Sequence, residues 1–166
     1  CAVTKKPACM NFHLSHIPER TAQPRSHGLT VVMDKGLSLA ETKNLLSVAA
    51  PHIDMVKLAF GTPLLTLSLK EKVKLYQEKG VTVFLGGIFF EAFVVRNQFD
   101  DYLSFIQEYG ITCMEVSDGS IHLTQAEKCG YIERLSRHGK VLSEVGSRDK
   151  DREQVTPPYR WIEIIN

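Results

Sequence analysis

The feature that most constrains the fold of this chain is a repeat of about 30 residues, in which a short apolar run precedes an amphipathic segment. The apolar runs are rich in Val and Ile and lie at residues 29–33, 55–60, 81–85, 111–116 and 141–145. Runs of this kind are typical of strands buried on both faces of a parallel sheet. Their alternation with helical segments predicts an α/β fold and leaves two architectures open, a doubly wound sheet and a (β/α)8 barrel.

Local signals mark where the intervening helices begin. Ser38 with Glu41, and Thr124 with Glu127, each have the spacing of a capping box, in which side chain and backbone satisfy each other's hydrogen bonds. Apolar residues at helical spacing, or a proline pair at a helix start, predict further helices at 69–79, 101–109 and from 157 onward.

Composition narrows the class of protein. The chain has 166 residues, of which 43% are hydrophobic and 23% charged, and its net charge is +1. A near-neutral chain has no overall field that would attract nucleic acid or a membrane surface, and no apolar run approaches the ~20 residues of a membrane-spanning helix. The four cysteines form no CxxC pair, so we expect reduced thiols and a cytoplasmic protein. These features are compatible with a homo-oligomer.

The repeat also suggests how the chain is organised. Residues 1–9 lack the apolar core of a signal peptide, and we expect them to form a disordered extension ahead of Met10. Residues 10–166 contain about five strand–helix units, whereas a closed barrel needs eight strands. We therefore expect 10–166 to be the N-terminal part of a single barrel domain, truncated after about five units.

Charged residues and glycines gather where each predicted strand ends. Parallel α/β sheets bind ligands at the carboxyl ends of their strands, so these positions are the candidates for a site. Glycine there lets backbone N–H groups approach a ligand closely. In chain order the residues are Lys35, Lys57, Gly61, Thr62, Gly86, Gly87, Glu115, Ser117, Asp118, Gly119, Glu144 and Arg148.

These residue types suit an anionic ligand and a divalent cation. Lys35, Lys57 and Arg148, joined by Arg25 from the lead-in, could neutralise phosphate and carboxylate groups. The carboxylates predicted to bind Mg²⁺, which prefers hard oxygen ligands, are Glu115, Glu144 and Asp118. Structural alternatives remain open, namely a Lys57–Glu115 ion pair inside the barrel, solvated arginines, and a turn-forming role for Asp118.

At these motifs the sequence resembles the phosphosulfolactate synthase family. The resemblance covers about residues 10–166 and rests on Asp34-Lys35-Gly36, Lys57 with Gly61-Thr62, Gly86-Gly87, Ser117-Asp118-Gly119 and Glu144-Val145-Gly146. It implies a (β/α)8 barrel and a Mg²⁺-dependent lyase that adds sulfite to phosphoenolpyruvate and yields (2R)-phospho-3-sulfolactate. In archaea that product enters coenzyme M biosynthesis.

The resemblance also implies roles for individual residues. Arg148, Lys57 and Lys35 would be catalytic, and Glu115, Glu144 and Asp118 would bind the metal ion. The substrate would contact Arg25, Gly61, Thr62, Gly86, Gly87, Ser117 and Gly119. Arg148 departs from the family pattern, because a lysine usually donates a proton there and arginine is a poor acid near neutral pH. Ile88 and Pro63 depart as well, where threonine and serine are usual.

Three other functions remain open at this stage. The chain could be a non-catalytic relative, like the plant heat-stress-associated proteins, although it keeps the Asp-Lys-Gly and Ser-Asp-Gly motifs. Lys57 could instead form a Schiff base in an aldolase. Finally, the chain could be an inactive fragment of a larger enzyme.

Overall fold

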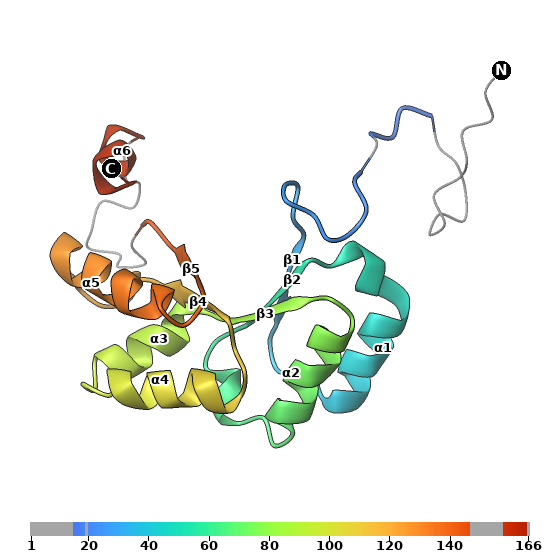
Figure 1. Ribbon diagram of the computed structural model, residues 1–166, viewed down its shortest axis with the longest axis horizontal. Helices are drawn as coiled ribbons and strands as arrows, with labels where there is room; N and C mark the ends of the chain where they lie inside the picture. The colour runs from blue at the N-terminus through green and yellow to red at the C-terminus, as the bar shows by residue number, and fades with distance from the viewer. Residues whose placement is uncertain (1–14, 19, 147–157, 166) are drawn as a thin grey trace.

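The five predicted strands form one parallel sheet. The computed structural model describes residues 15–18, 20–146 and 158–165 (Figure 1). The strands are β1 (Val31–Asp34), β2 (Met55–Leu58), β3 (Thr82–Leu85), β4 (Cys113–Val116) and β5 (Lys140–Ser143). Each strand pairs in parallel with the next one along the chain, so the sheet order is β1-β2-β3-β4-β5.

Helices connect the strands, and one more follows β5. They are α1 (Leu39–Ala49), α2 (Leu69–Glu78), α3 (Gly87–Val94), α4 (Phe99–Glu108), α5 (Gln125–Ser136) and α6 (Pro158–Ile165), with short 3₁₀ turns η1 (Ala50–His52) and η2 (Thr62–Leu64). Both predicted capping boxes are confirmed, at Ser38 and at Thr124. The sequence patterns did not predict α3, because its residues are mostly apolar and follow two glycines without a capping signal.

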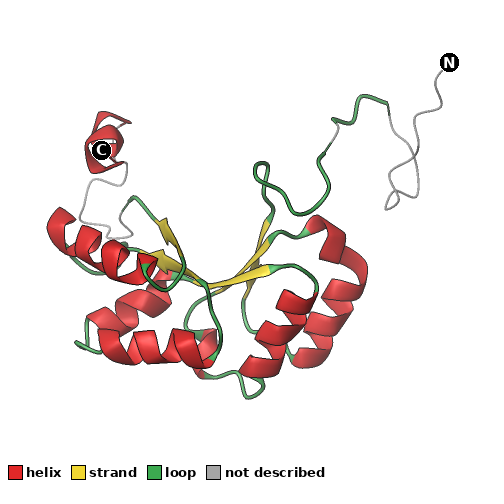
Figure 2. Ribbon diagram, in the orientation of Figure 1, coloured by secondary structure: helices red, strands yellow, loops and turns green. Residues whose placement is uncertain are grey.

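The helices between the strands lie on one side of the sheet. Figure 2 shows α1 to α4 together beneath the curved sheet, with α5 continuing along the same side. A doubly wound sheet would reverse its strand order and carry helices on both faces. The consecutive order seen here is instead a singly wound arrangement, which leaves the concave face of the sheet without helices from these connections.

The two faces of the sheet bury different side chains. On the helix side, residues such as Val56, Leu85 and Met114 pack with the helices into one large core. On the concave side, a small cluster is formed by Met55, Phe84, Cys113 and Leu142. Within the described part of the chain, no helix is long and apolar enough to span a bilayer.

Candidate active site

A charged pair lies on the concave face at the carboxyl end of the sheet. Lys57 on β2 donates from Nζ to Oε1 of Glu115 on β4, at 2.7 Å. The two strands are not neighbours, since β3 runs between them. Side chains alternate between the faces of a strand, and Lys57 and Glu115 share the concave face with the cluster around Phe84. Two charged residues predicted for the site are therefore brought together. This contact is also the Lys57–Glu115 ion pair that the sequence analysis gave as a structural alternative.

Gly86 and Gly87 make this contact possible, because a side chain at either position would collide with Lys57, Glu115 or Ser117. A Cβ atom on Gly86 would lie 2.8 Å from Cε of Lys57. A Cβ atom on Gly87 would lie 2.6 Å from Cβ of Ser117 and 2.9 Å from Oε1 of Glu115. The double glycine at the end of β3 thus lets the side chains from β2 and β4 meet across it.

Helix α3 holds the end of β4 at two points. The N–H of Gly87, at the start of α3, donates to Oε1 of Glu115 at 2.9 Å. One helical turn later, the buried carboxylate of Glu91 accepts hydrogen bonds from Ser117 Oγ and from the N–H groups of Gly119 and Ser120. Sequence reasoning did not include Glu91 among the site residues. Its spacing from Gly87 would have been informative only if α3 had been predicted.

A second group of predicted residues lies at the ends of β1 and β2. Lys35, just after β1, is exposed and its Nζ lies 5.7 Å from the ring centre of Phe60. Gly61 has a positive φ of 73° and leads into η2, where the Thr62 hydroxyl donates to the carbonyl of Ala59 at 2.8 Å. These residues place a cation and a tight turn beside the strand that carries Lys57.

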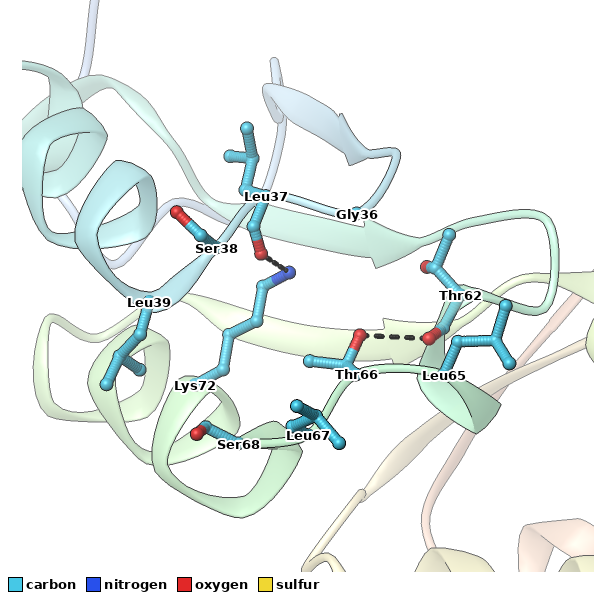
Figure 3. A pocket seen from close by; sticks show the side chains of 10 residues that line it. All are labelled: Gly36, Leu37, Ser38, Leu39, Thr62, Leu65, Thr66, Leu67, Ser68 and Lys72. Carbon is cyan, nitrogen blue, oxygen red and sulfur yellow. Dashed lines mark hydrogen bonds between the residues drawn. The ribbon is translucent and has the colours of Figure 1, made fainter.

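A cavity of about 360 Å³ lies between the β1–α1 and β2–α2 connections. Figure 3 shows its lining, in which Lys72 points its ammonium at the carbonyl of Leu37 and the Thr66 hydroxyl bonds the carbonyl of Thr62. The remaining lining residues are mostly leucines and hydroxyl residues. The cavity therefore adjoins the turn at Thr62 on the side where the helices begin.

Lys72 also belongs to a fully buried group of polar side chains, which we name the buried junction: Asp34, Lys72 and Tyr76. The Asp34 carboxylate accepts from Lys72 Nζ at 2.7 Å and from the Tyr76 hydroxyl at 3.0 Å. It also accepts the N–H groups of Gly36 and Leu37, each at 2.8 Å. Burial acts against its charge, but the hydrogen bonds from Lys72, Leu37 and Gly36 outweigh that effect and lower the pKa of Asp34.

The burial of Tyr76 and its closeness to the Asp34 charge raise the pKa of the tyrosine hydroxyl well above its usual value, so it remains a donor. The hydrogen bonds of the Asp34 carboxylate to Gly36, Leu37 and the junction side chains fix the β1–α1 turn.

Two of the predicted metal ligands lie near the ends of β4 and β5. Asp118 forms an ion pair with Lys128 of α5, with Oδ1 and Nζ 2.8 Å apart. The same ammonium donates to the carbonyl of Glu144 at 2.5 Å, and the Glu144 N–H donates to the carbonyl of Val116 at 3.0 Å. Lys128 thereby ties together the turns that follow β4 and β5.

Arg25 does not join this group. Its guanidinium forms an ion pair with Asp54 at 2.7 Å, and Asp54 immediately precedes β2, so both residues lie at the amino end of the sheet. The expectation that Arg25 contacts the substrate overlooked this partner, which is 29 residues away in the sequence. Arg148, like the predicted extension at 1–9, lies outside the described residues.

Comparison with known proteins identifies the family of this chain. The family model for (2R)-phospho-3-sulfolactate synthase (ComA) matches residues 18–166. The chain belongs to the phosphosulfolactate synthase family. It is 35% identical to the phosphosulfolactate synthase of Bacillus subtilis (strain 168), over 94% of this chain and 62% of the relative.

Two archaeal members of the phosphosulfolactate synthase family match to a similar degree. The enzyme of Methanothermobacter thermautotrophicus is 33% identical over 89% of this chain and 58% of its own length. That of Methanocaldococcus jannaschii is 34% identical over 84% of this chain and 57% of its own length. The chain thus spans about three-fifths of the curated relatives that it matches.

Glu115, Glu144 and Asp118 follow or end strands at the carboxyl end of the sheet, which we call the mouth, and would form only part of a metal site. Among the described residues, no group of three or more His, Cys, Asp or Glu side chains is arranged to hold a metal ion. Both hydrogen bonds to Glu115 fall on Oε1, which leaves Oε2 as a hard oxygen ligand. Mg²⁺ is usually bound by one or two carboxylates together with waters and substrate phosphates, so this donor set fits it.

Proposed function

We propose that this chain forms five strand–helix units of a (β/α)8 barrel whose mouth, at the carboxyl ends of the strands, joins sulfite to phosphoenolpyruvate. The product would be (2R)-phospho-3-sulfolactate. The observation that carries the proposal is the Lys57–Glu115 pair, which sits on the concave face at the carboxyl end of the sheet and is partly open to solvent. Membership of the phosphosulfolactate synthase family supports the same reaction.

The reaction defines what these side chains would do. The sulfur of sulfite forms a bond to C3 of the enol phosphate, and the C2–C3 π electrons move to C2 and spread into the carboxylate. A proton added to C2 from one face completes the product and sets its configuration. Lys57 would bind the carboxylate as its charge grows, because Glu115 holds its ammonium in place while using one of its three protons.

The remaining cations and carboxylates have distinct proposed roles. Lys35, at the neighbouring strand end, would bind the substrate phosphate beside the turn at Gly61. Arg148 is proposed to contact phosphate or carboxylate as well. Glu115 and Glu144 would hold Mg²⁺, which supplies Lewis-acid stabilisation of negative charge when bound. We set Asp118 aside as a ligand, since Lys128 already pairs with it.

The test is an assay of the full chain for sulfite-dependent loss of phosphoenolpyruvate, with and without Mg²⁺. Glu115→Gln should lower kcat/KM about 100-fold, because it removes both the charge that holds Lys57 and a magnesium ligand. Glu108→Gln, on an exposed position of α4, is the matched control and should behave as wild type.

Two outcomes would overturn the proposal. One is the absence of Mg²⁺-dependent turnover, and the other is an equal effect of Glu115→Gln and Glu108→Gln. Borohydride trapping of a carbonyl substrate on Lys57 would favour the Schiff-base alternative, since addition of sulfite needs no imine.

A further inference from the structure

Glu91 occupies an anion-binding turn that forms part of the mouth. It lies in the middle of α3 and is only 3% exposed. Its carboxylate accepts hydrogen bonds from at least three donors on the turn at 117–120. They are the Ser117 hydroxyl and the N–H group of Gly119 on Oε1, and the N–H group of Ser120 on Oε2, with both N–H distances 3.0 Å.

Backbone N–H groups and a hydroxyl that converge in this way normally bind anions such as phosphate. The family resemblance implied that Ser117 and Gly119 contact the substrate. In the folded chain these donors already face a carboxylate of the protein itself. A second anion at the same place would have to displace Glu91 or share its donors against charge repulsion.

We propose that Glu91 is an internal anion that fixes the turn at 117–120 and excludes the substrate phosphate from it. Glu91 is thus a positioning residue, and the phosphate is directed to Lys35, on the other side of β3. The second part of this inference rests on the proposed function. The first part, occupation of the turn by Glu91, does not.

The geometry of α3 explains why this position matters. Gly87 and Glu91 are one helical turn apart, so they face the end of β4 together. The first binds the Glu115 carboxylate through its N–H, and the second holds the turn that begins two residues after Glu115. Removing the Glu91 carboxylate should therefore release the turn while the Gly87–Glu115 bond is kept.

Chemical rescue tests the inference without any need for turnover. In Glu91→Ala the amides of Gly119 and Ser120 should exchange hydrogen about tenfold faster, and acetate should restore their protection by filling the vacated place. Acetamide and chloride at matched concentration should not. Glu108→Ala, which removes an exposed carboxylate, is the control. Unchanged protection in Glu91→Ala, or no difference between acetate and acetamide, would overturn the proposal.

A second variant keeps the test decisive if Glu91→Ala does not fold. Glu91→Gln preserves shape but has one acceptor oxygen in place of two, so one of the two amides should lose protection while the other keeps it. Equal protection of both amides in Glu91→Gln would contradict the assignment.

Inorganic phosphate tests where the substrate anion binds. In the wild-type chain, phosphate should shift the NMR signals of Lys35 and Gly36 and leave those of Gly119 and Ser120 in place. Shifts at Gly119 and Ser120 in the wild type would refute the exclusion. Failure of the sulfite assay alone would refute the proposed function, while the exchange and rescue results would still decide the role of Glu91.

Discussion

Two ion pairs near the carboxyl ends of neighbouring strands differ in how deeply they are buried and in how many hydrogen bonds their carboxylates accept. In the buried junction, Lys72 and Asp34 have side chains only 2% and 0% exposed. In the mouth pair, Lys57 and Glu115 are 21% and 9% exposed. Asp34 is in register with Leu58 on the helix side, whereas Lys57 is one residue earlier on β2 and points to the concave side.

The difference lies in how many bonds each carboxylate has left to make. Asp34 receives four donors, divided between its two oxygens, and lies where water cannot reach it. Within the part of the chain that the structure describes, Glu115 receives two donors, both on Oε1. A buried pair whose carboxylate accepts four donors serves the fold. An unsaturated pair at a solvated mouth can change partners when a ligand arrives.

The largest expected effect is on the buried junction. Lys72→Met leaves an uncompensated carboxylate inside the protein, and we expect the free energy of unfolding to fall by about 3–5 kcal/mol. Lys74→Met, two residues along the same helix and exposed, should change it by less than about 0.5 kcal/mol. Urea unfolding followed by circular dichroism measures both. Similar losses in the two variants would show that the buried junction adds no more stability than an exposed helix pair.

The mouth pair should respond in activity rather than in stability. Lys57→Met should lower kcat/KM for phosphoenolpyruvate about 100-fold, because it removes the cation that meets the growing charge. Its cost in stability should stay near about 1 kcal/mol, since Glu115 keeps the Gly87 N–H and some access to solvent. Steady-state kinetics beside urea unfolding tests this. A larger loss of stability than in Lys72→Met would reverse the comparison.

Acid should weaken the buried junction in a defined direction. The folded pKa of Asp34 lies below its ordinary value of 3.8, so the native state favours the charged form. The stability it contributes is fully present above about pH 4 and is lost as the pH falls through the lowered pKa. An NMR titration of the Asp34 carboxyl carbon should give a midpoint below 3.8. A midpoint above that value would show that burial outweighs the bonds from Lys72 and the turn.

The smallest expected effects come from two buried tyrosines. The Tyr76 hydroxyl donates to Asp34, whereas the Tyr102 hydroxyl is buried without a hydrogen-bond partner among the described residues. Tyr76→Phe should cost about 1–2 kcal/mol, and Tyr102→Phe should lie within about 0.5 kcal/mol of wild type. Thermal unfolding of both variants provides the measurement. Equal costs would mean that the hydroxyl of Tyr76 adds nothing to the junction.

Much of the fold was predictable because its signals are local. Strands β1 to β5 follow from the apolar runs, and both capping boxes follow from residues three apart. Helix α3 was not predicted, because its apolar stretch has no helical periodicity and no capping side chain. Glu91 was missed with it, since its role becomes visible only once the helix is placed.

The sequence predicted the site residues correctly only where their position at a strand end was enough to bring them together. Lys57, Glu115 and the double glycine meet because parallel strands end at one edge of the sheet. Arg25 and Asp118 have partners, Asp54 and Lys128, that no local pattern reveals. Two residues of the Asp34-Lys35-Gly36 motif have different roles. Its aspartate is structural, whereas its lysine is exposed near the mouth.

The glycines at the end of β3 have a consequence for how the protein assembles. Lys57 and Glu115 are 58 residues apart in sequence and touch only when β3 stands between their strands in the correct register. A slip of β3 by one residue would put a leucine side chain where Gly86 leaves a gap. Three consecutive units must therefore fold and align before the pair exists, so chemical competence would arise late and together with the native sheet.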